Sequence, residues 1–170
     1  MKRKKITSLA YGSVIAAVYA AATYLSAIFG IAYGPVQLRF SEALTVLSIF
    51  TPAAIPGLTV GCILGNLSSP YGIWDIVFGS AATLVSAIVA RKLRKLKIKS
   101  LPLLSIIIPV FFNAVFVGTE ITFLMPNGDA GFTAFAFAAL EVGIGELIVC
   151  LAGGIPVFYA LKRTNLFRLD

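Results

Sequence analysis

Carboxylates are rare in this sequence, and most of them interrupt apolar stretches. A carboxylate in such surroundings costs free energy unless it faces a polar cavity or a partner. Asn113 and Glu120 are seven residues apart, which is two helical turns, so a helix here places both on one face. We interpret them as a pair that binds a polar ligand. The acidic residues before Asp170 are Glu42, Asp75, Glu120, Asp129, Glu141 and Glu146.

Glu141 and Glu146 lie in the last apolar stretch and point in different directions if that stretch is helical. Five residues at ~100° per residue set their side chains about 140° apart. We therefore do not expect both to bind the same ligand group. Glu141 is a candidate ligand residue, whereas for Glu146 we expect helix packing or a hydrogen bond to the backbone.

Other candidate binding residues lie at the starts of apolar stretches and in the connections between them. Glu42 begins the second stretch, and Trp74 and Asp75 begin the fourth. Trp74 has the alternative role of a lipid-interface residue, and Asp75 that of an acid favoured by the helix macrodipole. The remaining candidates are Gln37, Arg39, Asn66 and Tyr71.

The stretch YGPVQLRFSE, residues 33–42, is a polar segment in an otherwise apolar chain. In an extended segment its alternating side chains point to opposite sides. Polar Gln37, Arg39 and Ser41 alternate with apolar Val36, Leu38 and Phe40. Arg39 is the only basic residue outside the two termini and one central run. We interpret the stretch as a loop that lies over a cavity rather than as a tether. Arg39 either contacts the ligand or, as we favour, forms an ion pair that acts as a latch. Its partner would be Glu42 or another carboxylate on the outer side of the predicted membrane.

The composition excludes several functions and predicts an integral membrane protein. The chain has 170 residues, of which 59% are hydrophobic and 12% charged, and its mean hydropathy is +0.96. It has no histidine, which excludes His-ligated metal centres and Ser-His-Asp hydrolysis. The two cysteines, Cys62 and Cys150, lie in apolar stretches and indicate neither a disulfide framework nor a metal site. We expect no metal, no cofactor and no enzymatic activity.

The basic residues form three clusters, in residues 2–5, 91–99 and 162–168, which the positive-inside rule assigns to the cytoplasm. An even number of spans must then separate neighbouring clusters. Three apolar stretches lie between the first two clusters, so the middle one must be broken. Pro52 and Pro56 lie at its midpoint and interrupt a helix. We read the N-terminal MKRKK and its apolar run as the first span rather than as a signal peptide.

The sequence therefore predicts an all-α membrane bundle of six transmembrane segments, with both termini cytoplasmic and residues 1–170 forming a single domain. The predicted spans are residues 6–29, 41–50, 53–67, 73–94, 101–124 and 132–161. Small residues at four-residue spacing permit close helix contact within the bundle. They are Gly12, Ala16 and Ala20, then Ser13, Ala17 and Ala21, and then Gly57, Gly61 and Gly65. For the two stripes of the first span the alternative is docking of a partner protein, and for the glycine stripe it is a ligand contact.

Three segments resemble the QueT family of queuosine-precursor transporters, substrate-binding S-components of energy-coupling factor (ECF) transporters. They are GPVQLRFSEALTVL (34–47), PAAIPGLTVGCILGNL (52–67) and WDIVFGSAATLVSAIVAR (74–91). The resemblance implies a six-helix subunit in a prokaryotic plasma membrane that captures a micronutrient from outside and that uses residues 33–42 as a lid. It also implies docking on a membrane T-component that two cytoplasmic ATPases drive. An Ala-x-x-x-Ala motif of the first helix would make this contact, either Ala16 with Ala20 or Ala17 with Ala21. The chain itself has no G-x-x-x-x-G-K-[ST] ATPase motif.

A 7-deazaguanine, such as queuine or its aminomethyl or nitrile precursor, fits the candidate residues chemically. Glu120 or Glu141 can hold the guanine-like edge, and Asp75 or Glu42 can meet a cationic amine. The assignments left open are Asn113, Gln37 or Asn66 for the carbonyl and Trp74 or Tyr71 for stacking. The alternatives are an S-component for another micronutrient, a free-standing transporter, an intramembrane enzyme and a structural subunit.

Overall fold

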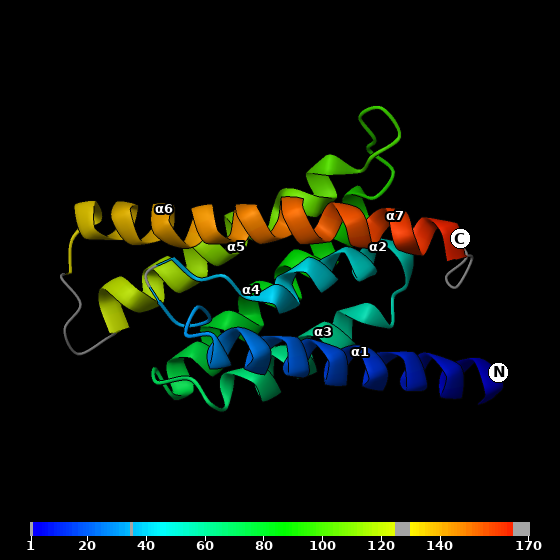
Figure 1. The fold of residues 1–170 in the computed structure, drawn as a ribbon, viewed down its shortest axis with the longest axis horizontal. Coiled ribbons are helices and arrows are strands. Elements are labelled where there is room, and N and C mark those ends of the chain that lie inside the picture. Colours follow the sequence, from blue (N-terminus) through cyan, green and yellow to red (C-terminus); the bar gives the residue numbers. More distant parts are fainter. Residues whose placement is uncertain (1, 35, 125–129, 165–170) are drawn as a thin grey trace.

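The computed structural model describes residues 2–34, 36–124 and 130–164, which form an all-helical bundle without a β-strand (Figure 1). This confirms the all-helical part of the predicted fold class. The α-helices are α1 Lys2–Ile28, α2 Leu47–Phe50, α3 Ala54–Asn66, α4 Ile73–Leu93, α5 Leu103–Thr119, α6 Phe132–Val149 and α7 Ile155–Thr164. A 3-10 helix, Phe40–Val46, precedes α2, and π-helical turns follow α5 and α6 at Glu120–Leu124 and Cys150–Gly154.

Within the described residues, four helical segments are long and apolar enough to cross a membrane. They are Lys5–Ile28, Ile73–Leu93, Leu103–Leu124 and Phe132–Thr164. The last has 33 residues, because the π-helical turn joins α6 to α7 without a break. Two shorter apolar helices, Phe40–Phe50 and Ala54–Asn66, lie between the first two. The described part of the chain thus contains four long and two short apolar helical segments.

The two short helices are separated by the proline-containing segment of the sequence. Thr51 is extended, with φ −136° and ψ 138°, and ends α2. Pro52 follows it and lacks the backbone N–H that a continuing helix requires. The threonine hydroxyl instead accepts a hydrogen bond from the Ala53 N–H at 3.3 Å. The chain then enters α3 in a new direction (Figure 1).

The glycines of α3 bring that helix into close contact with α1. A Cβ atom built on Gly61 would lie 2.8 Å from the carbonyl oxygen of Ala16, and one on Gly65 would lie 2.9 Å from Thr23. A larger side chain at either position would force the helices apart. The stripe Gly57, Gly61 and Gly65 therefore packs within the bundle, which is the internal-packing alternative of the sequence analysis.

The helix ends that carry the basic clusters lie on one side of the molecule. The N-terminal end of α1 and the C-terminal end of α7 lie at the same end of the bundle (Figure 1). Lys97 and Lys162, from two different basic clusters, line one cavity of about 330 Å³. This arrangement allows all the basic clusters to face one side of a membrane, as the positive-inside rule requires. That this side is cytoplasmic stays a prediction.

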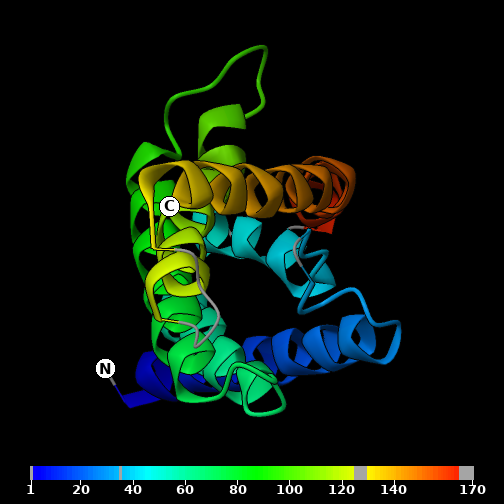
Figure 2. The same cartoon turned by 90° about the vertical axis from the view of Figure 1, so that its left-hand side faces the viewer.

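The 3-10 helix occupies the space between the outer rods of the bundle. Figure 2 shows α1 and the α6–α7 rod on opposite sides of the molecule, with α4 and α5 forming one wall. The 3-10 helix contacts the α6–α7 rod closely, since a Cβ built on Gly153 would lie 2.7 Å from the Cβ of Ala43. Its polar residues Ser41, Glu42 and Thr45 are buried. The chain therefore carries polar groups into the interior at this point.

Candidate functional site

The extended segment before the 3-10 helix turns its polar side chains inward. Gln37 and Arg39 are each 5% exposed and Ser41 is fully buried, whereas Val36 and Phe40 are 41% and 42% exposed. The predicted alternation is therefore present, with the apolar side chains on the outside. Such a surface suits a lipid environment, while the polar side chains line the interior.

Arg39 and Asp75 form a buried ion pair that we call the latch. Nη2 of Arg39 donates to both carboxylate oxygens of Asp75, at 3.0 and 3.1 Å, and Nε donates to the Ala32 carbonyl at 3.0 Å. The guanidinium carbon lies 5.2 Å from the centre of the Tyr33 ring. Burial alone would lower the pKa of Arg39, but the Asp75 carboxylate raises it above its usual value. The structure thus gives Arg39 the partner Asp75 rather than Glu42.

A small residue makes room for the latch on α4. Asn66, at the end of α3, donates its side-chain N–H to the Asp75 carbonyl at 2.9 Å. A Cβ built on Gly79 would lie 2.7 Å from that nitrogen and 3.4 Å from a carboxylate oxygen of Asp75. Any side chain at Gly79 would therefore displace Asn66. Gly79 was not among the predicted site residues, although a glycine one turn after Asp75 is a signal that another side chain packs closely against the helix there.

Trp74 and Tyr71, the two predicted alternatives for stacking on the ligand, pack against other residues of the protein. Trp74 is 43% exposed and lies beside Phe78, with 6.4 Å between the ring centres. This favours the lipid-interface role. The Tyr71 hydroxyl donates to the Tyr33 carbonyl at 3.0 Å, so Tyr71 joins the loop after α3 to the loop after α1. Neither ring stacks inside the bundle, because each starts from a helix end or loop at the surface.

A second buried group consists of Glu42, Glu146, Asn113 and Tyr19, which we call the acidic cluster. The Tyr19 hydroxyl donates to one carboxylate oxygen of Glu42, and the other oxygen has no partner within the described residues. Glu146 accepts a hydrogen bond from the Cys150 thiol at 3.6 Å. Glu42 and Glu146 lie within interaction range of each other and of Asn113.

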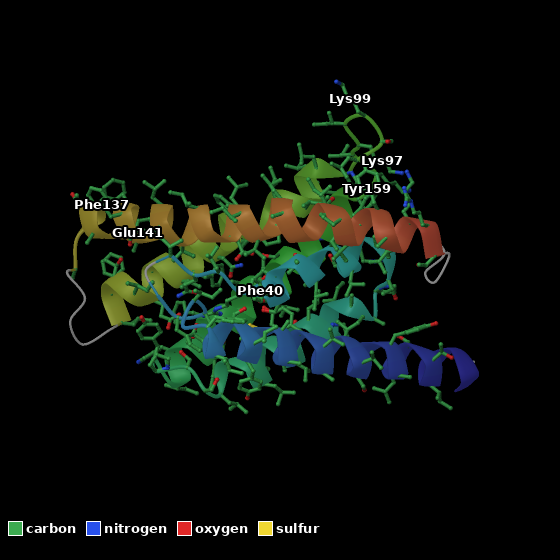
Figure 3. All side chains as sticks on the ribbon, in the orientation of Figure 1. Phe40, Lys97, Lys99, Phe137, Glu141 and Tyr159 are labelled. Atoms are coloured by element: carbon green, nitrogen blue, oxygen red, sulfur yellow. The ribbon has the colours of Figure 1, made fainter. Side chains whose placement is uncertain are left out.

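The two glutamates of α6 face in different directions, as their spacing predicts. Glu146 is buried, whereas Glu141 is exposed and lies near Phe137 on the outer side of α6 (Figure 3). The structure thus places Glu146, rather than Glu141, in the interior of the bundle, and the binding role of Glu141 stays a prediction. The helical spacing fixes only the angle between the two residues. Both faces of α6 carry apolar residues, so the sequence holds no clear signal for which glutamate turns inward; in the structure Glu146 lies on the buried face with Val142, Val149 and Cys150.

Glu120 is the most isolated carboxylate of the interior. Its side chain is 1% exposed, and neither carboxylate oxygen has a hydrogen-bond partner within the described residues. Its charged neighbours are Asp75 and Arg39 of the latch. Asn113, two turns earlier on α5, is also buried with an unpartnered amide nitrogen, but it belongs to the acidic cluster. The pair thus lies on one buried face, and its members lie beside different groups.

The buried groups without partners indicate a place for a polar ligand. Buried polar atoms in proteins are nearly always hydrogen-bonded, and an unmade bond costs about 1–3 kcal/mol. The side chains of Gln37 and Asn66 each add one such atom. Besides four serine hydroxyls, the unpartnered set among the described residues therefore contains amide donors, an amide acceptor and carboxylate acceptors. These are the groups that recognise a flat heterocycle with N–H and carbonyl edges.

The comparisons with known proteins identify the family of the chain. The sequence model of a family described as QueT transporter matches residues 9–163. The chain belongs to the QueT transporter family. A curated relative from Lactococcus lactis subsp. cremoris (strain MG1363), named "Queuosine precursor transporter QueT", is 33% identical over 85 residues. The matched segment is 50% of this chain and 50% of the relative. No solved structure matches the chain.

In this QueT family member, the alanines predicted to dock a partner fall into two sets. Ala16 and Ala20 are buried, and Ala16 contacts Gly61 of α3. Ala17 and Ala21 lie on the exposed face of α1, one turn apart. Only the second set is accessible from outside the chain. Internal packing therefore takes up the first stripe, and the second stays a candidate docking surface.

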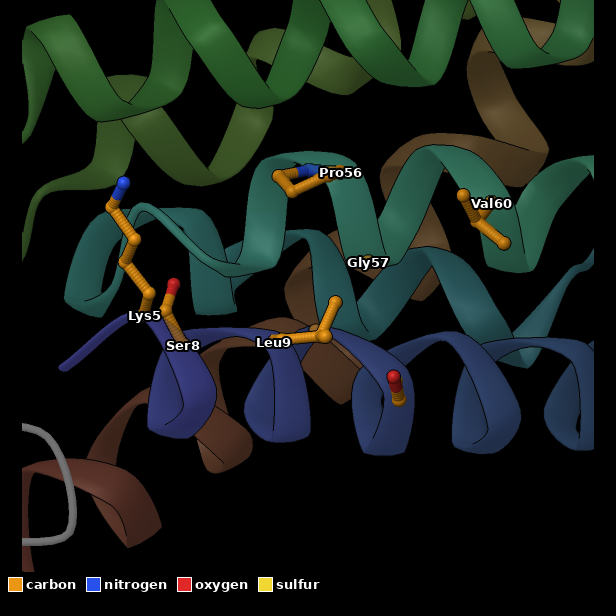
Figure 4. A pocket seen from close by; sticks show the side chains of 8 residues that line it. Lys5, Ser8, Leu9, Pro56, Gly57 and Val60 are labelled. Atoms are coloured by element: carbon orange, nitrogen blue, oxygen red, sulfur yellow. The ribbon is translucent and has the colours of Figure 1, made fainter. Parts of the chain in front are cut away.

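Two cavities of this QueT family member lie away from the latch and the acidic cluster. The larger, of about 390 Å³, is a groove between the first half of α1 and α3, with Lys5, Ser8 and Gly57 in its wall (Figure 4). The other, of about 330 Å³, is lined by basic residues and Phe158. Neither contains a residue predicted to bind substrate. The interior groups without partners, rather than these grooves, define the candidate site.

Proposed function

We propose that this QueT family protein is the substrate-binding S-component of an ECF transporter in a prokaryotic plasma membrane. It captures a queuosine precursor, a 7-deazaguanine, from the outer side. The observation that carries the proposal is the buried Glu120 carboxylate, whose two oxygens have no partner within the described residues. A guanine-like edge supplies two parallel N–H groups, which match a carboxylate that can accept two hydrogen bonds.

The neighbouring amides complete the recognition of the base. Gln37 brings an unpartnered amide N–H from the lid, and Asn113 brings one from α5. Either can donate to the carbonyl oxygen of a 7-deazaguanine. Because the lid also carries Arg39 of the latch, closure of the lid and formation of the site occur together. We do not assign Trp74 or Glu141 to the ligand, since they are exposed, nor Tyr71, since its hydroxyl is bound to the Tyr33 carbonyl.

ATP-driven transport would require partners, because the sequence contains no G-x-x-x-x-G-K-[ST] motif. The resemblance to S-components supplies the partners: a membrane T-component and, through it, two cytoplasmic ATPases. The exposed Ala17 and Ala21 offer a small-residue surface on which a partner helix can pack closely. We propose that this stripe, rather than Ala16 and Ala20, contacts the T-component.

The direct test is equilibrium binding of queuine and its biosynthetic precursors to the detergent-purified full chain. We expect a dissociation constant below about 10 µM, which corresponds to about −7 kcal/mol, for at least one 7-deazaguanine. Guanine and an unrelated vitamin such as riboflavin serve as comparison ligands. Tight binding of the vitamin without any 7-deazaguanine would instead identify an S-component for another micronutrient.

A free-standing transporter is the second candidate, and a separate experiment distinguishes it. Vesicles that contain this chain alone should bind the ligand without accumulating it if partners supply the energy. Accumulation that follows a proton or sodium gradient in such vesicles would contradict the S-component role and leave ligand binding intact.

A further inference from the structure

The acidic cluster places two buried carboxyl groups side by side. Glu42 and Glu146 are 2% and 5% exposed and lie within interaction range of each other. Close packing on both sides holds them there: Gln37 against Gly145, and Ala43 against Gly153. Among the described residues neither carboxylate has an ion-pair partner, because Arg39, the nearest cation, is held by Asp75.

Two buried carboxylates at short range repel each other when both are ionised. Such a pair is stable only if a proton or a cation lies between them. Tyr19 donates one hydrogen bond to Glu42 but brings no positive charge. The second Glu42 oxygen and the Asn113 amide nitrogen remain without partners, and both are more than nine-tenths buried. These unpartnered atoms indicate that a ligand group belongs beside the pair.

We propose that Glu42 and Glu146 form a receptor for a cationic alkylamine on the substrate. The inference rests on the proposed function and adds a specificity to it: the preferred 7-deazaguanine carries a protonated aminomethyl-type arm rather than a neutral nitrile. The ammonium has three N–H donors and one positive charge. It therefore neutralises the two carboxylates together and supplies the free Glu42 oxygen with a donor.

The position of the receptor relative to Glu120 suits a ligand that has a heterocyclic base at one end and a charged amine at the other. Asn113, beside Glu42 and Glu146, is seven residues from Glu120 on α5, which is about 10 Å along the helix. A bicyclic base held at Glu120 can extend its arm toward Asn113 along this face. Asp75 is not the amine receptor, because both of its oxygens accept from Arg39.

The matched pair of 7-aminomethyl- and 7-cyano-7-deazaguanine tests the proposal on the detergent-purified full chain. The two ligands share the base and differ in the charge of the arm. We expect the aminomethyl compound to bind at least about tenfold more tightly, because a hydrogen bond between charged groups is stronger than one to a neutral nitrile. In Glu146→Gln and in Glu42→Gln, the ratio of the two affinities should fall to about one. Glu141→Gln, on the exposed face of the same helix, should keep the wild-type ratio.

The possible outcomes distinguish failure of the amine receptor from failure of the proposed function. Equal affinities for the two ligands in the wild type would overturn the amine receptor and leave the proposed function in place. Binding of neither ligand, nor of queuine, would overturn the proposed function itself. A wild-type preference that both Gln variants retain would overturn the assignment to Glu42 and Glu146. Loss of both ligands in both variants would also count against it, because a receptor for the arm should leave recognition of the base intact.

Discussion

The backbone of Gln37 lies directly against Gly145, so that a methyl group on Gly145 would overlap the Gln37 carbonyl oxygen. Gln37 belongs to the segment interpreted as a lid, and Gly145 precedes the buried Glu146 on α6. The contact therefore holds the lid against the helix that carries one half of the acidic cluster. A glycine at this position permits the closed arrangement that the structure describes.

Gly145→Ala should push the lid away from α6. Over-packing of this kind costs about 1–3 kcal/mol, so we expect a lower free energy of unfolding and weaker ligand binding. The matched control is Gly143→Ala on the same helix, where a Cβ would lie 3.6 Å from Ala114, an ordinary contact. Thermal unfolding of the detergent-purified variants measures the first effect, and equilibrium binding the second. Equal behaviour of the two alanine variants would contradict a tightly closed lid.

The latch should be the most costly single interaction to break. Asp75→Asn leaves the buried Arg39 charge without its partner, which typically costs about 3–5 kcal/mol. Arg39→Met leaves Asp75 unpaired in the same way. We expect the double variant to be clearly more stable than the sum of the single effects predicts, because it removes both charges. Equilibrium unfolding in mixed micelles gives the coupling free energy. A coupling free energy near zero would mean that Arg39 and Asp75 contribute to stability independently, which would contradict the latch.

Glu120→Gln should weaken binding of the 7-deazaguanine by at least about tenfold, because a hydrogen bond to a charged group contributes about 1.5–3 kcal/mol. The amide also replaces one acceptor by a donor, which would face the N–H groups of the base. Stability should not fall, since the wild-type carboxylate is buried without a partner within the described residues. Glu141→Gln is the control on the exposed face of α6. Unchanged affinity in Glu120→Gln would move the base to another part of the interior.

The sequence patterns that predicted the structure correctly are local ones. Helical fold class follows from the long apolar stretches, and the inward turn of Gln37 and Arg39 follows from strict alternation with apolar neighbours. The burial of Asn113 and Glu120 on one face follows from their seven-residue spacing. Each of these depends on the geometry of one element, which periodicity determines.

The contacts between residues of different helices and loops could not be predicted from such local patterns. Asp75 is 36 residues from Arg39, and several outer carboxylates were equally suitable partners by charge. Glu146 enters the site because the opposite face of α6 from Glu141 packs inward, and spacing alone does not say which face that is. Gly79 and Gly145 matter only because another segment approaches them closely. Such contacts depend on how the helices pack, which a single sequence does not specify.

The two alanine stripes of α1 should respond differently to the same substitution. Ala16→Trp inserts a large side chain against Gly61 and should destabilise the fold, whereas Ala17→Trp adds it to the exposed face and should leave the unfolding temperature nearly unchanged. If the exposed stripe docks the T-component, Ala17→Trp and Ala21→Trp should abolish co-purification with it while substrate binding persists. Co-expression with the T-component and affinity capture measure this. Normal co-purification of both exposed-face variants would place the docking surface on another helix.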